Sequence, residues 1–158
     1  MDNKIVKFII SLALPFIAGG IGARITYGSI SSWYQYLNKP VFSPPNNLFG
    51  IVWTVLYILM GVSFYLVWIS KAAKYKKEGA VRIYIIQLVL NCLWSLIFFG
   101  LHSPLLAFVE LIFLWVSIFL TIRSFYLVNK KATLLLYPYL FWVTFAAFLN
   151  LSIIILNR

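Results

Sequence analysis

The sequence predicts an all-α membrane protein, a bundle of five transmembrane helices with a long structured loop between helices 1 and 2. Only 10% of the 158 residues are charged and 63% are hydrophobic, whereas about 25% of residues are charged in a water-soluble domain. A bilayer core of about 30 Å takes about 20 residues of α-helix, and five apolar runs reach that length. A β-barrel is disfavoured, because barrel strands alternate polar and apolar residues. We expect a single domain over residues 1–158, with helices at about 5–27, 46–70, 82–101, 104–127 and 134–156.

The 13 lysines and arginines divide unevenly between the two sides of such a bundle. The side with the N-terminus, loop 2–3 and loop 4–5 carries ten of them. The other side carries Arg24, Lys39 and Arg158. Cytoplasmic loops are enriched in Lys and Arg, so we expect a bacterial cell membrane with the N-terminus in the cytoplasm and with loop 1–2 and the C-terminus outside. This topology explains the net charge of +10 without a nucleic-acid partner. The ten are Lys4, Lys7, Lys71, Lys74, Lys76, Lys77, Arg82, Arg123, Lys130 and Lys131.

The first run is too long for the apolar core of a signal peptide, and four further spans follow it, so we interpret it as helix 1. Pro15 removes a backbone donor and favours a kink. Ala18 with Gly22, and Gly19 with Ala23, are pairs of small residues spaced by four, which let helices pack closely in lipid. Tight packing within the bundle is the plain interpretation of this cluster.

Loop 1–2, about residues 28–45, is rich in aromatic residues and stiffened by proline. Pro40 and the pair Pro44-Pro45 favour extended backbone and exclude a helix through this segment. Loops of this length are usually functional, so we expect a lid over an apolar pocket. The alternative is an aromatic belt at the lipid headgroups, formed by Trp33, Tyr34 and Tyr36.

Helix 2 is expected to begin with an N-cap at Asn46 or Asn47. Four large side chains follow at spacings of four, three and four, which places them on one face of the helix. In lipid, such a stripe packs against a neighbouring helix more often than against a ligand, and both interpretations stay open. The stripe is Trp53, Tyr57, Met60 and Phe64.

Helix 3 carries amides, Gln87 and Asn91, on the face that also holds Trp94. An uncharged amide inside a membrane needs a partner. Asn91 is therefore expected to point into the bundle, either toward another helix or toward a polar group of a ligand. Cys92 is the single cysteine and cannot form an internal disulfide.

A tight link joins helices 3 and 4, with Ser103 as the expected N-cap and Pro104 as the first helical residue. His102 then lies in a surface loop, and no second His, Cys or Asp stands at ligand spacing, so we expect no metal site. Glu110 in helix 4 is the one acid expected within the bilayer, where carboxylates are usually functional or paired.

Helix 5 places four residues along one face at spacings of three, four and four. A large ring beside a small residue suits a flat ligand, and it suits close helix packing equally well. The four residues are Tyr139, Trp142, Ala146 and Asn150.

Three segments resemble the signature blocks of a known family. They are WYQYLNKPVFSPPNNLFGIVWTVLY (33–57), NCLWSLIFFGLHSP (91–104) and PYLFWVTFAAFLN (138–150). They are similar to the tryptophan-rich sensory protein family, which includes the mitochondrial translocator protein or peripheral benzodiazepine receptor. The resemblance covers the whole chain. It implies a five-helix bundle, usually a homodimer, that binds tetrapyrroles such as protoporphyrin and, in some members, sterols and isoquinoline or benzodiazepine drugs.

Carried over by motif, the resemblance implies a ligand pocket lined by the aromatic residues of loop 1–2 and by tryptophans of helices 2 and 5. Residues 151–158 lack the tyrosine of the sterol-recognition pattern, so sterol is not expected as the native ligand. The implied ligand-binding residues are Trp33, Tyr34, Leu37, Pro44, Pro45, Trp53, Tyr57, Asn91, Trp94, Trp142, Ala146 and Asn150.

The first function hypothesis is a membrane receptor that binds, senses or moves tetrapyrroles and requires no cofactor. A porphyrin is flat and apolar, and stacked aromatic side chains bind such a face well. Because no axial ligand is evident, the metal-free porphyrin suits the site better than haem. The second hypothesis is light-dependent oxidative degradation of protoporphyrin, in which Trp53 and Trp142 would be the catalytic residues. The alternative is a tetrapyrrole or lipid transporter acting as a dimer, because five spans do not divide into equal inverted repeats.

Overall fold

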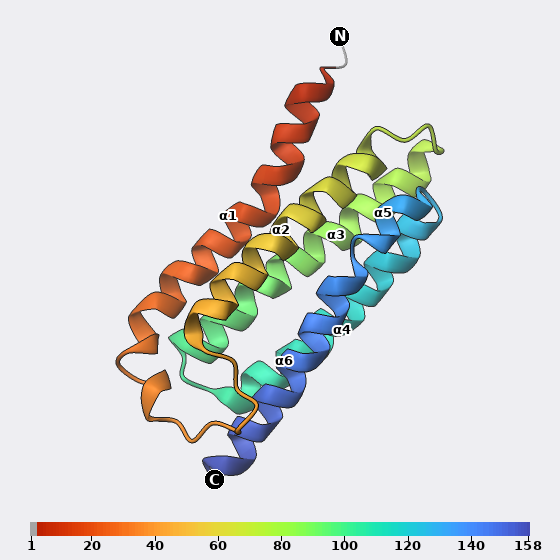
Figure 1. Ribbon diagram of the computed structural model, residues 1–158. Coiled ribbons are helices and arrows are strands. Elements are labelled where there is room, and N and C mark those ends of the chain that lie inside the picture. Colours follow the sequence, from red (N-terminus) through yellow and green to blue (C-terminus); the bar gives the residue numbers. More distant parts are fainter. Residues whose placement is uncertain (1–2) are drawn as a thin grey trace.

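The computed structural model describes residues 3–158 and shows a bundle of long helices (Figure 1). Within this part of the chain, five helical stretches are long and apolar enough to cross a membrane. The all-α fold class is thereby confirmed. The elements are α1 (Lys4–Ile30), η1 (Tyr34–Tyr36), α2 (Asn46–Trp68), α3 (Lys74–Ser95), η2 (Leu96–Gly100), α4 (Pro104–Tyr126), α5 (Lys130–Leu134) and α6 (Tyr137–Leu156).

The helix bounds depart from the apolar runs in two places. α3 begins at Lys74, well before residue 82, because its first turns contain good helix formers and the exposed pair Lys74–Glu78 at 3.8 Å. The fifth span is built from two helices, α5 and α6, separated by a turn at residues 135–136. Pro138 lies at the start of α6, where its missing N–H costs nothing.

The expected side-chain cap of α2 is wrong. Pro45 occupies the N-cap position of α2 and no side chain caps it. Ser103 does occupy the N-cap position of α4, but its side chain makes no cap bond. Asparagine caps two other helices instead, through Asn3 before α1 and Asn129 before α5. Both asparagines accept hydrogen bonds from first-turn N–H groups, as expected of an N-cap.

The connections gather at two opposite ends of the bundle (Figure 1). The start of α1, the α2–α3 connection and the α4–α5 connection lie at one end, which we call the basic end because most cations are there. Residues 31–45, the α3–α4 link and the C-terminus lie at the other end, which we call the loop end. Residues 31–45 are called the lid segment below.

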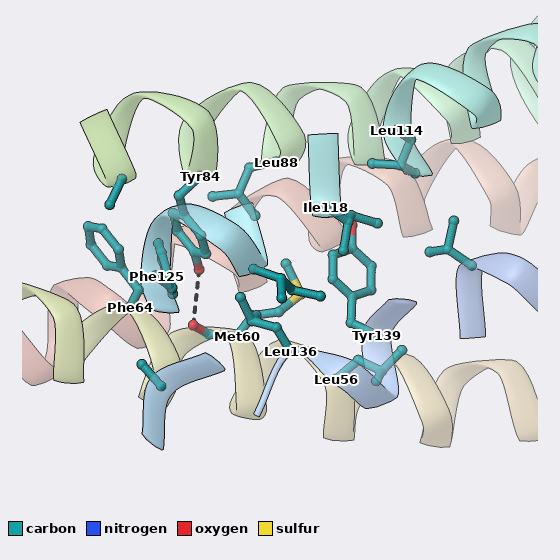
Figure 2. Close-up of a cluster of buried hydrophobic side chains, with 14 of the residues drawn as sticks. Leu56, Met60, Phe64, Tyr84, Leu88, Leu114, Ile118, Phe125, Leu136 and Tyr139 are labelled. Carbon is teal, nitrogen blue, oxygen red and sulfur yellow. Dashed lines mark hydrogen bonds between the residues drawn. The ribbon is translucent and has the colours of Figure 1, made fainter. Parts of the chain in front are cut away.

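In the half of the bundle near the basic end, buried hydrophobic side chains pack around Tyr84 (Figure 2). The Tyr84 ring stacks on Phe64 with centroids 4.6 Å apart and planes at 5°. Its hydroxyl donates to the main-chain oxygen of Met60 at 3.3 Å. A buried tyrosine needs such a partner for its hydroxyl, and this ring therefore joins α3 firmly to α2.

Glycines bring α1 close to its neighbours. A methyl group at Gly61 of α2 would come within 2.9 Å of the Leu12 Cα and of the Ser11 main-chain oxygen. One at Gly22 of α1 would lie 2.9 Å from the Ser95 Oγ of α3. Helices in lipid associate through this kind of close contact between small residues. Gly22 of α1 therefore packs closely as the sequence predicts, and Gly61 of α2 gives a second close contact with α1.

The lid segment is fastened to the end of α6 by three hydrogen bonds. The Asn38 main-chain N–H donates to the Asn157 Oδ1 at 2.9 Å, and the Asn157 Nδ2 donates to the main-chain oxygen of Asn38 at 2.9 Å. The Asn38 Nδ2 also donates to the main-chain oxygen of Leu156 at 3.3 Å. We call this set the Asn38–Asn157 latch, and it joins residues more than a hundred positions apart in the sequence.

We expect Gly61→Ala to destabilise the protein by about 1–3 kcal/mol, the usual cost of overpacking a filled contact. The added methyl meets backbone atoms of α1 that cannot move aside. Thermal unfolding in detergent measures the effect. The control is Gly79→Ala, where a methyl would have no heavy atom within 4 Å. An unfolding midpoint for Gly61→Ala at or above that of the parent protein would contradict the assigned contact.

We expect Asn157→Ala to loosen the lid segment, because it removes the two latch hydrogen bonds that the Asn157 side chain makes with the Asn38 backbone. The loss of each hydrogen bond costs about 0.5–1.5 kcal/mol. Amide exchange in residues 31–45 should therefore become roughly tenfold faster. Hydrogen–deuterium exchange in nanodiscs measures this local opening. Asn47→Ala is the control, since this exposed amide makes no side-chain hydrogen bond within residues 3–158. Unchanged exchange in Asn157→Ala would show that other contacts hold the lid segment.

A candidate ligand cavity beneath the lid segment

A cavity of about 470 Å³ lies in the loop-end half of the bundle, beneath the lid segment. This volume falls in the range of small-molecule sites, about 300–1,000 Å³. Its walls come from α1, α2, α3 with η2, and α6. The lining residues from α2, α3, η2 and the lid segment are Tyr34, Asn46, Phe49, Gly50, Trp53, Thr54, Tyr57, Asn91, Trp94, Ser95, Phe98 and Phe99. Those from α1 and α6 are Phe16, Gly19, Gly20, Ala23, Thr26, Tyr27, Ile30, Ala146, Leu149, Asn150 and Ile153.

Two pairs of stacked rings form opposite parts of the wall. Trp53 stacks on Tyr57 of the next turn of α2, with centroids 5.4 Å apart and planes at 28°. Trp94 stacks on Phe98 at 5.2 Å and 24° where α3 passes into η2. Residues four apart lie on one face of a helix, so each pair follows from its spacing. The two pairs offer broad apolar faces to a ligand.

Asn91 provides the polar centre at the floor of the cavity. Its Nδ2 donates to the Tyr139 hydroxyl at 3.0 Å, and its Oδ1 accepts from the Tyr57 hydroxyl at 3.5 Å. Asn91 and Tyr139 are both buried. This amide therefore finds its partners in α2 and α6, the first of the two alternatives that the sequence left open, and it joins three helices.

Two polar atoms of the wall have no partner within residues 3–158. They are the Nε1 of Trp94 and the Oδ1 of Asn150, both shielded from solvent. The other end of the Asn150 amide is occupied, because its Nδ2 donates to the main-chain oxygen of Pro104 at 2.8 Å. A buried polar atom without a hydrogen bond costs about 1–3 kcal/mol. Both atoms belong to residues of the cavity wall.

Tyr34 closes the cavity from the lid segment. It is 5% exposed and its ring lies 5.6 Å from that of Phe99. Burial raises the pKa of the Tyr34 hydroxyl, and a hydrogen bond with Ser43 acts in the opposite direction. Tyr34 is therefore a neutral roof at physiological pH. Lys39 contacts Tyr34 as well: its Nζ lies 4.7 Å from the ring centroid and donates to the main-chain oxygen of Tyr34 at 3.0 Å.

Of the residues expected to bind ligand, the structure brings one group together at the cavity wall and leaves another outside it. The first group is Tyr34, Trp53, Tyr57, Asn91, Trp94, Ala146 and Asn150. The second is Trp33, Leu37, Pro44, Pro45 and Trp142. In the second group Trp33 stacks on His102 at 4.6 Å, and Leu37 packs around Tyr34.

Trp142 lies on the outer side of α6, in a shallow apolar groove shared with α2. Its ring contacts Phe49 at 5.8 Å and Phe145 at 5.4 Å. At 100° per residue, Trp142 is turned about 60° from Tyr139, whereas Ala146 is turned only about 20°. Trp142 therefore lies at one edge of the four-residue face expected for this span, and only Ala146 and Asn150 of that face line the cavity. Trp53 and Trp142 do not share a wall.

Sequence reasoning missed the whole α1 wall. Gly19 and Ala23 were interpreted as packing residues, yet both line the cavity. A methyl at Gly19 would meet the Tyr57 ring, whereas one at the neighbouring Gly20 would meet no heavy atom within 4 Å. The signal was the cluster of small residues in the first span, which leaves space as well as allowing contact. Glu110 is buried and its carboxyl oxygens have no partner within residues 3–158, but it does not line the cavity.

Comparison with known proteins agrees with this architecture. Residues 11–156 match the TspO/MBR family. The chain is 40% identical over 154 residues to the tryptophan-rich protein TspO of Archaeoglobus fulgidus, which covers 98% of this chain and 99% of that protein. It is also 40% identical over 157 residues to the tryptophan-rich protein TspO of Chlorobaculum tepidum, covering 99% of each chain. The translocator protein of Bos taurus is 36% identical over 139 residues, which are 87% of this chain and 82% of that protein.

The match to the family spans all five membrane-length helices of the described chain. It includes every residue that lines the cavity. The chain is an integral membrane protein and belongs to the TspO/MBR family.

Proposed function

We propose that this protein is a membrane receptor that binds a tetrapyrrole of the protoporphyrin type in the cavity beneath the lid segment. The observation that carries the proposal is the cavity wall, where Trp53, Tyr57, Trp94 and Phe98 present their rings around few polar atoms. Aromatic faces pack well against a flat apolar macrocycle. Isoquinoline and benzodiazepine drugs are flat and apolar too, and we expect them to compete for the same space.

The free polar atoms suit the edges of such a ligand. The Trp94 Nε1 can donate to a carboxylate or carbonyl oxygen, and the Asn150 Oδ1 can accept from an N–H group. Arg24 is exposed on α1 next to the lining residue Ala23, in reach of a carboxylate outside the cavity. Lys39 is less suited, because its Nζ already donates to main-chain oxygens of the lid segment.

The lining favours a metal-free ring. His, Cys and Met are the usual protein ligands of haem iron, and the lining residues within positions 3–158 include none of them. The name of one relative, the tryptophan-rich sensory protein of Cereibacter sphaeroides, is in line with a sensing role, and that of another, the translocator protein of Bos taurus, with a transport role. Assembly as a homodimer stays a prediction.

We expect Ala146→Phe to abolish protoporphyrin binding, because the new ring would occupy the space beside Asn150 in the cavity. Quenching of tryptophan fluorescence by added protoporphyrin measures binding, and the affinity should fall at least about 100-fold. The matched control is Leu151→Phe, which enlarges an exposed residue of the same helix outside the cavity. Parent protein without any quenching would refute the tetrapyrrole proposal. Quenching unchanged in Ala146→Phe would place the ligand elsewhere.

We further propose that the basic end faces the cytoplasm, as the excess of Lys and Arg there favours. The lid segment and the C-terminus would then face the outside. In a Cys92→Ser background, a membrane-impermeant maleimide added to intact cells should label Gln35→Cys of the lid segment. It should not label Tyr75→Cys at the basic end, although Tyr75 is 71% exposed. The opposite labelling pattern would reverse the orientation.

A further inference from the structure

The cavity is open on one side only. Its lining residues from α3, η2, α6 and the lid segment are all buried or half-buried. The exposed lining residues belong to α1 and α2 alone. They are Phe16, Gly20, Ala23, Tyr27, Asn46, Gly50 and Thr54. We call this opening between the two helices the α1–α2 mouth.

The mouth is kept open by the absence of side chains. A methyl group at Gly20 of α1, or at Gly50 of α2, would have no heavy atom within 4 Å. One residue earlier on α1, Gly19 is in tight contact with the Tyr57 ring. The two helices therefore touch at Gly19 and part beyond it toward the loop end, and both sides of the resulting gap carry glycine.

The mouth faces the hydrocarbon region of the bilayer. At 1.5 Å per residue, Gly20 lies about 15 Å along α1 from Ile30 at the loop end. Exposed isoleucines flank it, with Ile17 at 60%, Ile21 at 52% and Ile51 at 61%. This is a surface for acyl chains.

Two threonine hydroxyls, of Thr54 at the mouth and of Thr26 beside it, do not call for water, and the other polar residues of the mouth are Tyr27 and Asn46. The Thr54 hydroxyl donates to the Gly50 oxygen at 2.8 Å, and the Thr26 hydroxyl donates to the Gly22 oxygen at 2.9 Å. Both hydroxyls are thus satisfied within their own helix, which is how threonine is accommodated in apolar surroundings. The mouth therefore fits an apolar environment.

The water-facing side of the cavity is closed by contrast. Tyr34 fills the roof at 5% exposure, and the Asn38–Asn157 latch holds the lid segment on α6. Phe42 of the lid segment adds a ring contact with Phe145 of α6 at 6.2 Å. Entry from water would require breaking the three latch hydrogen bonds and separating packed rings. Entry from the bilayer would pass between Gly20 and Gly50, which have no side chains to move aside.

We propose that the α1–α2 mouth is the portal of the cavity, and that the ligand is an amphiphile already dissolved in the bilayer which enters sideways between Gly20 and Gly50. This inference deepens the proposed function, since it rests on the cavity holding a ligand and names the class of that ligand as membrane-partitioned. Release follows the same path into lipid, so the lid segment need not open in each cycle of binding.

The test labels a thiol inside the cavity and needs no porphyrin. Ala146→Cys in a Cys92→Ser background places one thiol at the cavity wall. The protein is reconstituted in nanodiscs and reacted with lipid-soluble N-phenylmaleimide. Adding Gly20→Phe and Gly50→Phe should slow the labelling at least about tenfold by filling the mouth. Both new side chains enter open space, so circular dichroism should show a folded protein.

Two controls make the result decisive. Gly28→Phe adds a ring to α1 at a glycine that is also free of neighbours within 4 Å but does not line the cavity, and it should leave the rate unchanged. Asn157→Ala unlatches the lid segment and should change the rate less than twofold. Slowing below fivefold in the double variant, equal slowing in Gly28→Phe, or marked acceleration in Asn157→Ala would overturn the portal. If the labelling rates follow the expected pattern but protoporphyrin does not quench the tryptophan fluorescence of the parent protein, the tetrapyrrole proposal is refuted and the portal is retained.

Discussion

The close approach of α1 and α2 at Gly61 is the contact on which the shape of this bundle depends. Burying apolar surface between helices gains little in a bilayer, because the lipid tails are apolar as well. Helix association therefore relies on short-range contact, and α1 and α2 are so close at Gly61 that a methyl group there would lie 2.9 Å from the Leu12 Cα. Farther along, Gly22 holds α1 against Ser95 of α3. α1 thus leaves α2 to follow α3, and the wedge between α1 and α2 becomes the open side of the cavity.

The two halves of the bundle use the same kinds of residue with opposite results. In the basic-end half, the rings of Phe64 and Tyr84 fill the interior, and the Tyr84 hydroxyl has a partner in α2. In the loop-end half, rings line the wall and leave the middle empty, while Trp94 and Asn150 each keep a polar atom without a partner among the described residues. A ligand that supplies both partners would recover part of the cost of burying them. The unpartnered atoms therefore support the proposed binding of a ligand.

The lid segment and the α1–α2 mouth divide the boundary of the cavity between two solvents. The Asn38–Asn157 latch consists of exposed hydrogen bonds at the water-facing end, where water competes for the same donors and acceptors. The mouth has glycine on both sides, at Gly20 and Gly50, and faces lipid, where hydroxyls such as that of Thr54 bond within their own helix. Each closure uses the interactions that its surroundings permit. With the proposed portal, this arrangement would couple binding to the bilayer rather than to the aqueous phase.

The amino-acid sequence by itself determined the class of protein, the number of spans and part of the cavity wall. Apolar runs of helical length have one stable form in lipid, and the spacing of Trp53 with Tyr57 on one helix face follows from helical geometry alone. The signature segments further identified Trp94, Ala146 and Asn150 as wall residues. The break between α5 and α6 and the cap of α2 were less predictable, because short local preferences at helix ends compete with packing.

Only the tertiary structure decided which side of each helix faces the cavity. Spacing leaves a face uncertain by tens of degrees, and that margin moved Trp142 into a groove on the outside of α6. The glycines of α1 likewise have two possible roles, contact or space. Gly19 contacts Tyr57 and Gly20 leaves a gap, and no local pattern distinguishes these neighbours, because the position of α2 relative to α1 is set by contacts several turns away.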